Sequence, residues 1–387
     1  MRRRRVDRGP LLRALLVVCA ASLLTVGSAC AGAVDTSSSP RSAAGAISGT
    51  TTYPPAKPVR VPVGISPGAE FLAQSSAMQN RELDAAVRAG ITWLRIDLDW
   101  SVIEPVEGRM NFAQTDGLVA AARARGFSVL GVLDYTPRWA QDPTVRAGTT
   151  HGRPSTPEVF AAFASKAANH YAQQITTYEI WNEPNLALFF LPRPDAAYYT
   201  RMVQASYQRI HAAIPGATVL AGSLAPGGDN ADGTSIAPTT FAEQMYGAGV
   251  EGTLDAFSDH PYSYPASPND PRTAAYNAFY RLRYIFGTLQ RHGDGARQIW
   301  LTEIGAPSAA VTTDEGVVPI DEKRQAEIIG ETLMAAGQLG YSGPAFLYTL
   351  RDDQTGSPDI GKNFGLLRSD FSPKPAYAVV QQYTGAK

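Results

Sequence analysis

The stretch Thr177-Tyr178-Glu179-Ile180-Trp181-Asn182-Glu183-Pro184-Asn185 sets the expectations for the whole chain. Its β-branched, aromatic and apolar residues predict a buried strand, which the proline ends because it has no N–H for the ladder. An apolar strand rarely tolerates a carboxylate unless the charge is paired or used. Asn182 and Glu183 fall where the strand leaves its sheet, and in parallel α/β folds that end binds ligands.

A second stretch repeats this design far along the chain. Residues 298–307 read Gln-Ile-Trp-Leu-Thr-Glu-Ile-Gly-Ala-Pro, an apolar strand that ends near Glu303 and is followed by glycine and proline. Two carboxylates on two strand ends, distant in sequence, are the groups that glycoside hydrolysis uses. Glu183 and Glu303 are therefore the candidate catalytic pair.

Short apolar runs alternate with amphipathic stretches through the rest of the chain. This alternation predicts a parallel sheet, and eight such units predict closure into a single (β/α)8 TIM barrel. The alternative is an open doubly wound sheet, although no Gly-rich nucleotide turn and no GxxxxGK[ST] motif occur. The expected strands are 61–66, 92–98, 128–133, 176–181, 218–223, 256–260, 298–302 and 345–350, and the expected helices are 78–89, 114–125, 157–171, 195–213, 238–247, 273–291, 321–338 and 375–383.

Polar residues gather at the ends of these strands, whereas the strand starts are bland. In a barrel this asymmetry predicts a site on the C-terminal face. The polar residues at the strand ends include Arg95, Asp97, Asp99, Asp134, Tyr135, Asp259, His260, Tyr262, Tyr348, Arg351, Asp352 and Asp353.

The N-terminal part has the layout of an export signal. Residues 1–33 combine an arginine-rich start, an apolar run too short to span a bilayer, and a segment of small residues. Plain cleavage after Ala31 or Ala33 and lipidation at Cys30 both remain open. Residues 34–58 are rich in Ser, Thr and Pro and predict a flexible tether, so residues 59–387 form the expected barrel domain.

Composition limits the classes of partner. The leader to Ala33 holds six of the 34 basic residues and one of the 35 acidic residues, which leaves 28 and 34, a net charge of about −6. No basic stripe stands out, so we expect no nucleic acid partner. Both cysteines, Cys19 and Cys30, lie in the leader, so the domain has neither a disulfide nor a thiol nucleophile.

Other catalytic classes lack their sequence signals. No two of the five histidines have HxH or HExxH spacing, so no metal and no other cofactor is expected. No GxSxG motif occurs, which argues against a serine hydrolase of that type.

The motifs resemble those of glycoside hydrolase clan A, the retaining β-glycosidases on TIM barrels. Trp181-Asn182-Glu183-Pro184 is similar to the clan's acid/base strand, strand four, and residues 301–305, Leu-Thr-Glu-Ile-Gly, are similar to its nucleophile strand, strand seven. Residues 100–112 and His260-Pro261-Tyr262 resemble segments of the cellulase-like and family 39 members. The likeness spans about residues 61–383 and implies a bacterial family 39-like endoglycosidase that acts on exported polysaccharide.

The resemblance assigns roles to the strand-end residues. Glu183 would be the general acid and then the general base, and Glu303 the nucleophile that forms a glycosyl-enzyme ester. Asn182 would donate to the sugar 2-hydroxyl, and Arg95 and Tyr262 would keep Glu303 ionised. The alternative for each carboxylate is a structural ion pair, and for Asn182 a turn cap at the strand end.

The remaining candidates have two open interpretations each. His260 would contact a sugar hydroxyl or satisfy a hydrogen bond in the core. Asp134 would bind substrate or pair with Arg95, and the rings of Trp100 and Trp139 would stack on sugars or cover the core. Clan members often carry a tryptophan at the end of strand eight, where residues 345–350 have none, and Tyr348 is the candidate replacement.

The leading hypothesis is therefore a retaining glycosidase that cleaves a β-linked extracellular or cell-envelope polysaccharide or oligosaccharide. A transglycosylase that uses the same site is a variant of it, and a catalytically silent carbohydrate-binding barrel is the rival from another class. We expect a monomer, either secreted or held on the outer face of the membrane through a lipidated Cys30.

Overall fold

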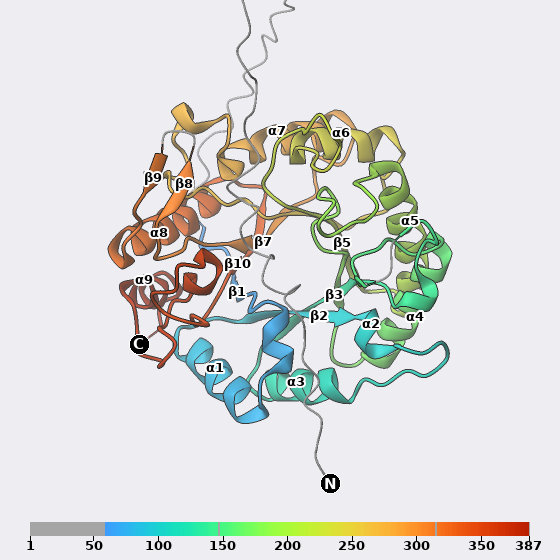
Figure 1. Ribbon diagram of the computed structural model, residues 1–387, viewed down its shortest axis with the longest axis horizontal. Coiled ribbons are helices and arrows are strands. Elements are labelled where there is room, and N and C mark those ends of the chain that lie inside the picture. The colour runs from blue at the N-terminus through green and yellow to red at the C-terminus, as the bar shows by residue number, and fades with distance from the viewer. Residues whose placement is uncertain (1–58, 146–147, 314–315, 387) are drawn as a thin grey trace, which may run out of the picture.

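The computed structural model describes residues 59–145, 148–313 and 316–386. Within these residues the chain forms a closed barrel of eight parallel strands surrounded by helices (Figure 1). The predicted single (β/α)8 TIM barrel is thereby confirmed. The predicted leader, the tether and Cys30 lie outside the described residues, so what the sequence indicates about them stays a prediction.

The barrel strands follow one another around the axis in chain order, and each lies parallel to both neighbours. The order around the barrel is β1-β10-β7-β6-β5-β4-β3-β2, and pairing of β1 with β2 closes the ring. Because all strands are parallel, their C-terminal ends meet on one face. The strands are β1 (Val63–Ile65), β2 (Trp93–Asp99), β3 (Ser128–Asp134), β4 (Thr177–Ile180), β5 (Thr218–Leu224), β6 (Ala256–Asp259), β7 (Ile299–Ile304) and β10 (Ser342–Leu347).

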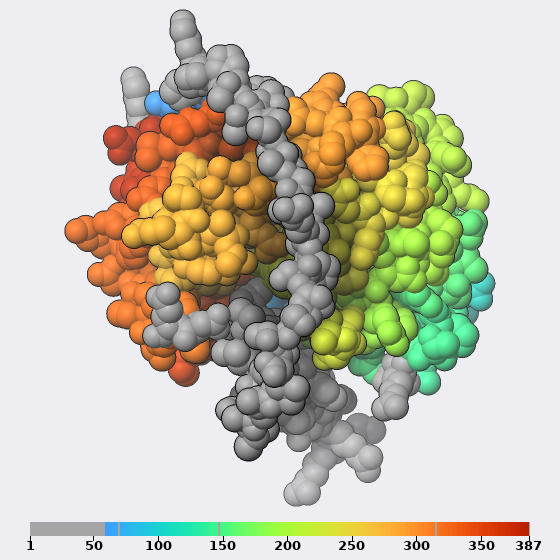
Figure 2. Space-filling model, turned by 90° about the horizontal axis from the view of Figure 1, so that it is seen from above, coloured from blue at the N-terminus to red at the C-terminus, as the bar shows by residue number. Residues whose placement is uncertain are grey.

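Helices cover the outside of the barrel, and the predicted helices match them within a few residues. They start at recognisable caps: Asp195 and Asn277 accept from backbone N–H groups of the first turns of α5 and α7. Consecutive units lie side by side along the wall (Figure 2). The helices are α1 (Ser76–Arg88), α2 (Trp100–Ile103), α3 (Ala113–Ala124), α4 (Pro157–His170), α5 (Ala196–Ala213), α6 (Pro238–Gly247), α7 (Ala278–Arg291), α8 (Glu322–Gln338) and α9 (Pro375–Thr384).

Large apolar side chains close the barrel interior below the strand ends. Leu130, Leu220, Ala256, Trp300 and Phe346 form a separate buried cluster, with the ring of Trp93 packed against it. Gly64 and Gly343 make room for these rings. A Cβ on Gly64 would lie 2.3 Å from a ring atom of Phe346, and a Cβ on Gly343 would lie 2.3 Å from a ring atom of Trp300. This cluster fills one end of the barrel interior, so the opposite end is left for polar groups.

Two small elements were not predicted. The antiparallel pair β8 (Val311–Thr313) and β9 (Gly316–Val318) follows β7, and the short helix α2 follows β2 directly. The helix expected to start at residue 273 starts at Ala278, because Pro271–Thr273 form a separate 3-10 turn. Among the described helices none is both long and apolar enough to cross a membrane.

Candidate active site

The two carboxylates predicted from the sequence meet at the C-terminal face of the barrel. Glu303 lies in β7, and Glu183 lies in the loop just after β4. One oxygen of each lies within 4.8 Å of the other and of a ring nitrogen of His260, which follows β6. Strand ends that are far apart in sequence thus deliver two carboxyl groups and one imidazole to a single point.

Glu303 is held by donors from three other strand ends. Its Oε1 accepts from Arg95 Nη1 at 3.0 Å and from the Ser66 hydroxyl at 3.4 Å. Its Oε2 accepts from the Tyr262 hydroxyl at 2.8 Å. Three donors, one of them a guanidinium, fix the orientation of this carboxylate.

Arg95 connects this carboxylate to the rest of the site. Its Nε donates to Glu179 at 2.7 Å and its Nη2 to Asn182 Oδ1 at 2.8 Å, while the hydroxyls of Ser66 and Ser223 accept at 3.2 and 3.3 Å. Burial alone would lower the pKa of Arg95, but the carboxylates of Glu179 and Glu303 outweigh burial and raise it. The guanidinium therefore stays charged and orients four strand ends at once.

Glu183 has a different environment from Glu303. Its side chain is only 10 % exposed, and among the described residues its one hydrogen bond is shared with His260 Nδ1 at 3.0 Å. Burial raises the pKa of Glu183 to about 7, against a smaller lowering effect of the Arg95 charge. A carboxyl with this pKa keeps a substantial protonated fraction at neutral pH and can act as an acid.

His260 is a neutral partner for that carboxyl. Its side chain is fully buried, and burial lowers its pKa to about 4, although the nearby Glu303 charge opposes this. Its Nε2 lies 3.1 Å from the Ser223 hydroxyl, which can donate or accept. Either tautomer of the imidazole is therefore satisfied while its Nδ1 faces Glu183.

The backbone around the site is held in a rare conformation. Four of the five described non-glycine residues with positive φ lie at or just after strand ends: Tyr135 (55°), Trp181 (67°), Glu183 (51°) and Ser223 (50°). Such residues cost free energy and persist only where the surroundings enforce them. The Glu183 N–H donates to the Ser223 carbonyl at 3.0 Å, which ties two of these residues together.

Asn182 is oriented by Arg95. Because its Oδ1 accepts from the guanidinium, its amide nitrogen is left to donate, as a contact to a sugar hydroxyl requires. The side chain is half-buried beside Glu183.

Tyr348 belongs to an aromatic cluster on the Glu303 side. The centroid of its ring lies 5.4 Å from that of Phe364. The Phe364 centroid also lies 6.0 Å from that of Tyr262 and 5.6 Å from that of Tyr264. A Cβ on Gly68 would lie 3.3 Å from the Tyr348 ring, so this loop passes close by. Tyr348 thus lies next to the tyrosine that binds Glu303.

Asp134 is enclosed rather than open to a ligand. It is fully buried at the end of β3, and neither carboxylate oxygen has a hydrogen-bond partner among the described residues. Burial, together with the charges of Asp97 and Asp99, raises the pKa of Asp134 well above its usual value. The expected ion pair of Asp134 with Arg95 is absent among these residues, so Asp134 is best described as a buried carboxyl behind the site.

Trp100 requires a correction. It is 1 % exposed and stacks on Phe163 of α4, with its Nε1 donating to Glu104. A ring so enclosed has no face left for a sugar, so the expected stacking role is replaced by a core role. Trp139 packs edge-on against Trp100 and is 37 % exposed, and no contact among the described residues joins it to the carboxylate pair.

Two residues of the network were missed in the sequence. Ser66 and Ser223 are the last residues of two predicted strands, and each accepts from Arg95. Their position at strand ends was the only signal available, because serine is common at such ends. Glu179, the other carboxylate of the stretch that holds Glu183, is fully buried against Arg95.

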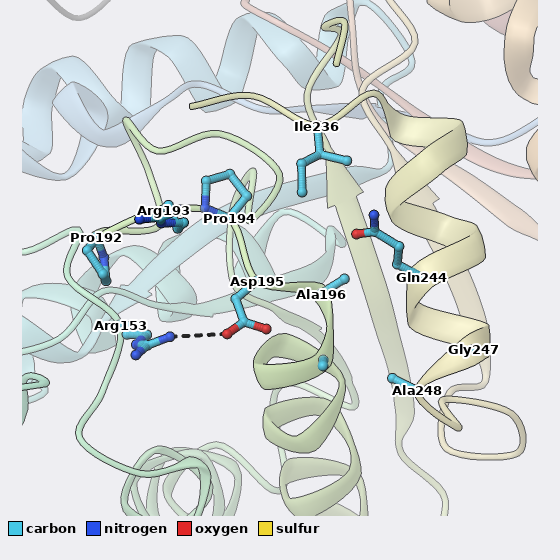
Figure 3. Close-up of a pocket in the computed structure, with 11 residues that line it drawn as sticks. Arg153, Pro192, Arg193, Pro194, Asp195, Ala196, Ile236, Gln244, Gly247 and Ala248 are labelled. Carbon is cyan, nitrogen blue, oxygen red and sulfur yellow. Dashed lines mark hydrogen bonds and ion pairs between the residues drawn. The ribbon is translucent and has the colours of Figure 1, made fainter. Parts of the chain in front are cut away.

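A pocket of about 690 Å³ lies elsewhere, between the start of α5 and the end of α6 (Figure 3). Arg153 and Asp195 form an ion pair at its edge, at 3.3 Å. None of the residues that surround Glu183 and Glu303 lines this pocket, so it is not part of the candidate active site.

Comparison with known proteins was informative only at the level of structure. No family model matches the chain, and no curated protein matches it. Solved structures similar to it include a family 39 glycoside hydrolase from Bacteroides cellulosilyticus WH2, with a TM-score of 0.64 and 24% identity over 84% of this chain. The chain spans 64% of the length of that protein.

Two further structures agree with it. A family 39 β-xylosidase from Caulobacter crescentus has a TM-score of 0.61 and 19% identity, covering 86% of this chain and 73% of its own. A GH5 subfamily 18 protein from Streptomyces cattleya, solved with GlcNAc, has a TM-score of 0.60 and 18% identity, covering 84% of this chain and 80% of its own. The predicted resemblance to the barrels of glycoside hydrolase clan A is confirmed at the level of fold.

Proposed function

We propose that this chain is a retaining glycoside hydrolase in which Glu183 is the acid/base and Glu303 the nucleophile. The observation that carries the proposal is the short separation of the two carboxyl groups, with oxygens within 4.8 Å. Retaining enzymes hold these groups about 5–5.5 Å apart, whereas inverting enzymes need roughly 6.5–9.5 Å to fit a water.

In the first step Glu183 donates its proton to the glycosidic oxygen as the bond breaks. Its pKa of about 7 means that a substantial fraction of the molecules carries this proton at neutral pH. Glu303 attacks the anomeric carbon from the opposite side and forms an ester. Its donors, Arg95 and Tyr262, hold the attacking oxygens in place before the reaction.

In the second step Glu183, now ionised, removes a proton from a water that attacks the same carbon. Glu303 leaves as a carboxylate, to which the guanidinium and the phenol again donate. The two inversions restore the starting configuration. Asn182 supports both steps if its amide donates to the 2-hydroxyl, a contact that strengthens in the transition state.

The substrate class is a further part of the proposal. We infer a β-linked polysaccharide or oligosaccharide outside the cytoplasm, because the motifs resemble clan A and because the N-terminal residues have the layout of an export signal. Similar structures include a family 39 β-xylosidase, which supports a β-glycosidase without assigning the sugar.

The decisive experiment is the stereochemistry of the product. A panel of aryl β-glycosides is offered to the wild type, with Glu303→Gln as the blank, and the first anomer released is read by NMR. Retention is expected, and an inverted anomer would remove Glu303 as nucleophile. Adding a sugar acceptor distinguishes hydrolysis from transglycosylation. Binding of oligosaccharide with no turnover on any substrate would instead favour the silent barrel.

A further inference from the structure

The catalytic pair and its histidine are also a set of metal ligands. Glu183, His260 and Glu303 offer two carboxylate oxygens and one imidazole nitrogen, which is a donor set that suits zinc. The three residues follow or end three different strands. Glu183 and His260 are 77 positions apart and His260 and Glu303 are 43 apart, so no spacing motif could reveal them. Sequence reasoning predicted no metal, and that prediction rested on spacing alone.

The distances are close to those of a coordination sphere. His260 Nδ1 lies 3.0 Å from Glu183 Oε1 and 3.6 Å from Glu303 Oε2. Zinc bonds of about 2.0–2.2 Å in a tetrahedron place neighbouring ligand atoms roughly 3.3–3.5 Å apart. The two carboxylate oxygens lie within 4.8 Å of each other, and these two atoms would have to move closer together to bind one ion. Among the described residues the Glu183 carboxyl has one hydrogen bond, to His260, so few contacts oppose its approach to Glu303.

The groups behind these ligands are of the kind that support a metal. A ligating imidazole normally donates its other ring N–H to an acceptor, and His260 Nε2 has the Ser223 hydroxyl at 3.1 Å. Glu303 is oriented by Arg95 and Tyr262, which donate to its two oxygens at 3.0 and 2.8 Å. Three protein ligands leave the fourth position for water.

We propose that zinc, or a divalent cation of similar preference, binds Glu183, His260 and Glu303 and reversibly blocks the active site. The inhibitory consequence rests on the proposed function, because the cation occupies both catalytic carboxylates. The binding itself does not, since it needs only the three side chains.

One electrostatic effect limits the affinity. Arg95 lies 3.0 Å from Glu303 Oε1, and its positive charge opposes a second cation, so a chelator should remove the metal readily.

The test measures binding and turnover separately. Chelator-treated protein is titrated with ZnCl₂ against a chromogenic chelator at pH 8, and MgCl₂ serves as the comparison cation. We expect one zinc per chain, a loss of affinity of at least about tenfold in His260→Gln and in Glu303→Gln, and no change in His211→Gln. His211 is a suitable control because it pairs with Asp255 on the outer wall.

Each outcome bears on the proposal. If His260→Gln unfolds, Glu183→Gln replaces it, because that change removes a ligand atom without changing size. Zinc binding that none of these variants weakens, or no binding at pH 8, overturns the site. Zinc that binds at the trio but raises turnover overturns the inhibitory role. If the wild type has no glycosidase activity at all, the proposed function fails while the binding titration still decides the metal site.

Discussion

The ends of β4 and β7 look alike in sequence and behave differently in the structure. Each is an apolar strand that runs to a glutamate and then a proline, at Glu183-Pro184 and at Glu303 with Pro307. Glu303 accepts from a guanidinium and from two hydroxyls. Glu183 shares one hydrogen bond with a neutral imidazole and has a pKa of about 7.

The contrast shows that the strand brings the carboxylate to the site but does not set its acidity. Both ends follow the pattern of an apolar strand that runs to a glutamate, and the partners that distinguish the two carboxyl groups come from β1, β2 and the segment after β6. Environments that separate the protonation states of two carboxyl groups are what a paired acid and nucleophile require. Changes at either end should therefore have different consequences.

The largest effect should follow removal of the well-bound carboxylate. Glu303→Ala leaves no nucleophile, so kcat on every aryl glycoside should fall by about 10⁴-fold or more. Steady-state rates over a series of leaving groups measure this, with circular dichroism to verify the fold. A residual rate above one hundredth of wild type would break the distinction between the two strand ends.

Removal of the protonated carboxyl should cost less, and the cost should depend on the substrate. Glu183→Ala should lower kcat by about 10²–10⁴-fold on poor leaving groups, which need the acid, and far less on dinitrophenyl glycosides. Azide should restore part of the rate by replacing activated water in the second step. Equal losses on good and poor leaving groups would contradict the acid role.

The raised pKa of Glu183 also predicts an effect on stability. The folded state holds this proton more tightly than the unfolded chain, so stability falls as pH rises from about 4.5 to about 7. Glu183→Gln cannot ionise, and it should be more stable than wild type at pH 8 by up to about 3 kcal/mol. Denaturant unfolding at pH 8 and at pH 4.5 measures this, and at pH 4.5 the two proteins should match.

The smallest effect concerns a single donor to Glu303. Tyr262→Phe removes one hydrogen bond to a charged group, worth about 1.5–3 kcal/mol, so kcat/KM should fall roughly 10- to 100-fold. Tyr280→Phe on α7 is the matched control. A Tyr262→Phe enzyme with wild-type rates would mean that Arg95 alone holds the nucleophile.

Much of this arrangement was predictable from sequence because the barrel makes strand ends converge. The spacing of the apolar runs located the strands. Polar residues in the second halves of the predicted strands or just after them, such as Arg95, Asn182 and His260, were then expected to converge on one face of the barrel. The motifs around Glu183 and Glu303 then assigned the two residues to strands four and seven. This reasoning placed the carboxylate pair without any knowledge of distances.

What failed was the direction of single side chains. Trp100 follows Asp99 by one residue, where the strand turns directly into α2, and its ring points into the helix layer instead of the site. Asp134 points inward as expected but lies too deep for a ligand. Ser66 and Ser223 carry no chemical signature until Arg95 is placed between them.

The hydrogen bonds of Arg95 have a consequence for how the chain folds. Its partners Ser66, Asn182, Ser223 and Glu303 lie 29, 87, 128 and 208 positions away, and Glu179 lies 84 away. No partial barrel can satisfy this guanidinium, because its acceptors come from β1, β4, β5 and β7. A half-formed ring would bury a charge without its counter-charges, which is strongly unfavourable. The arginine therefore stabilises only an assembly that already contains β1, β2, β4, β5 and β7, and we expect the site to form when β7 docks with the earlier strands.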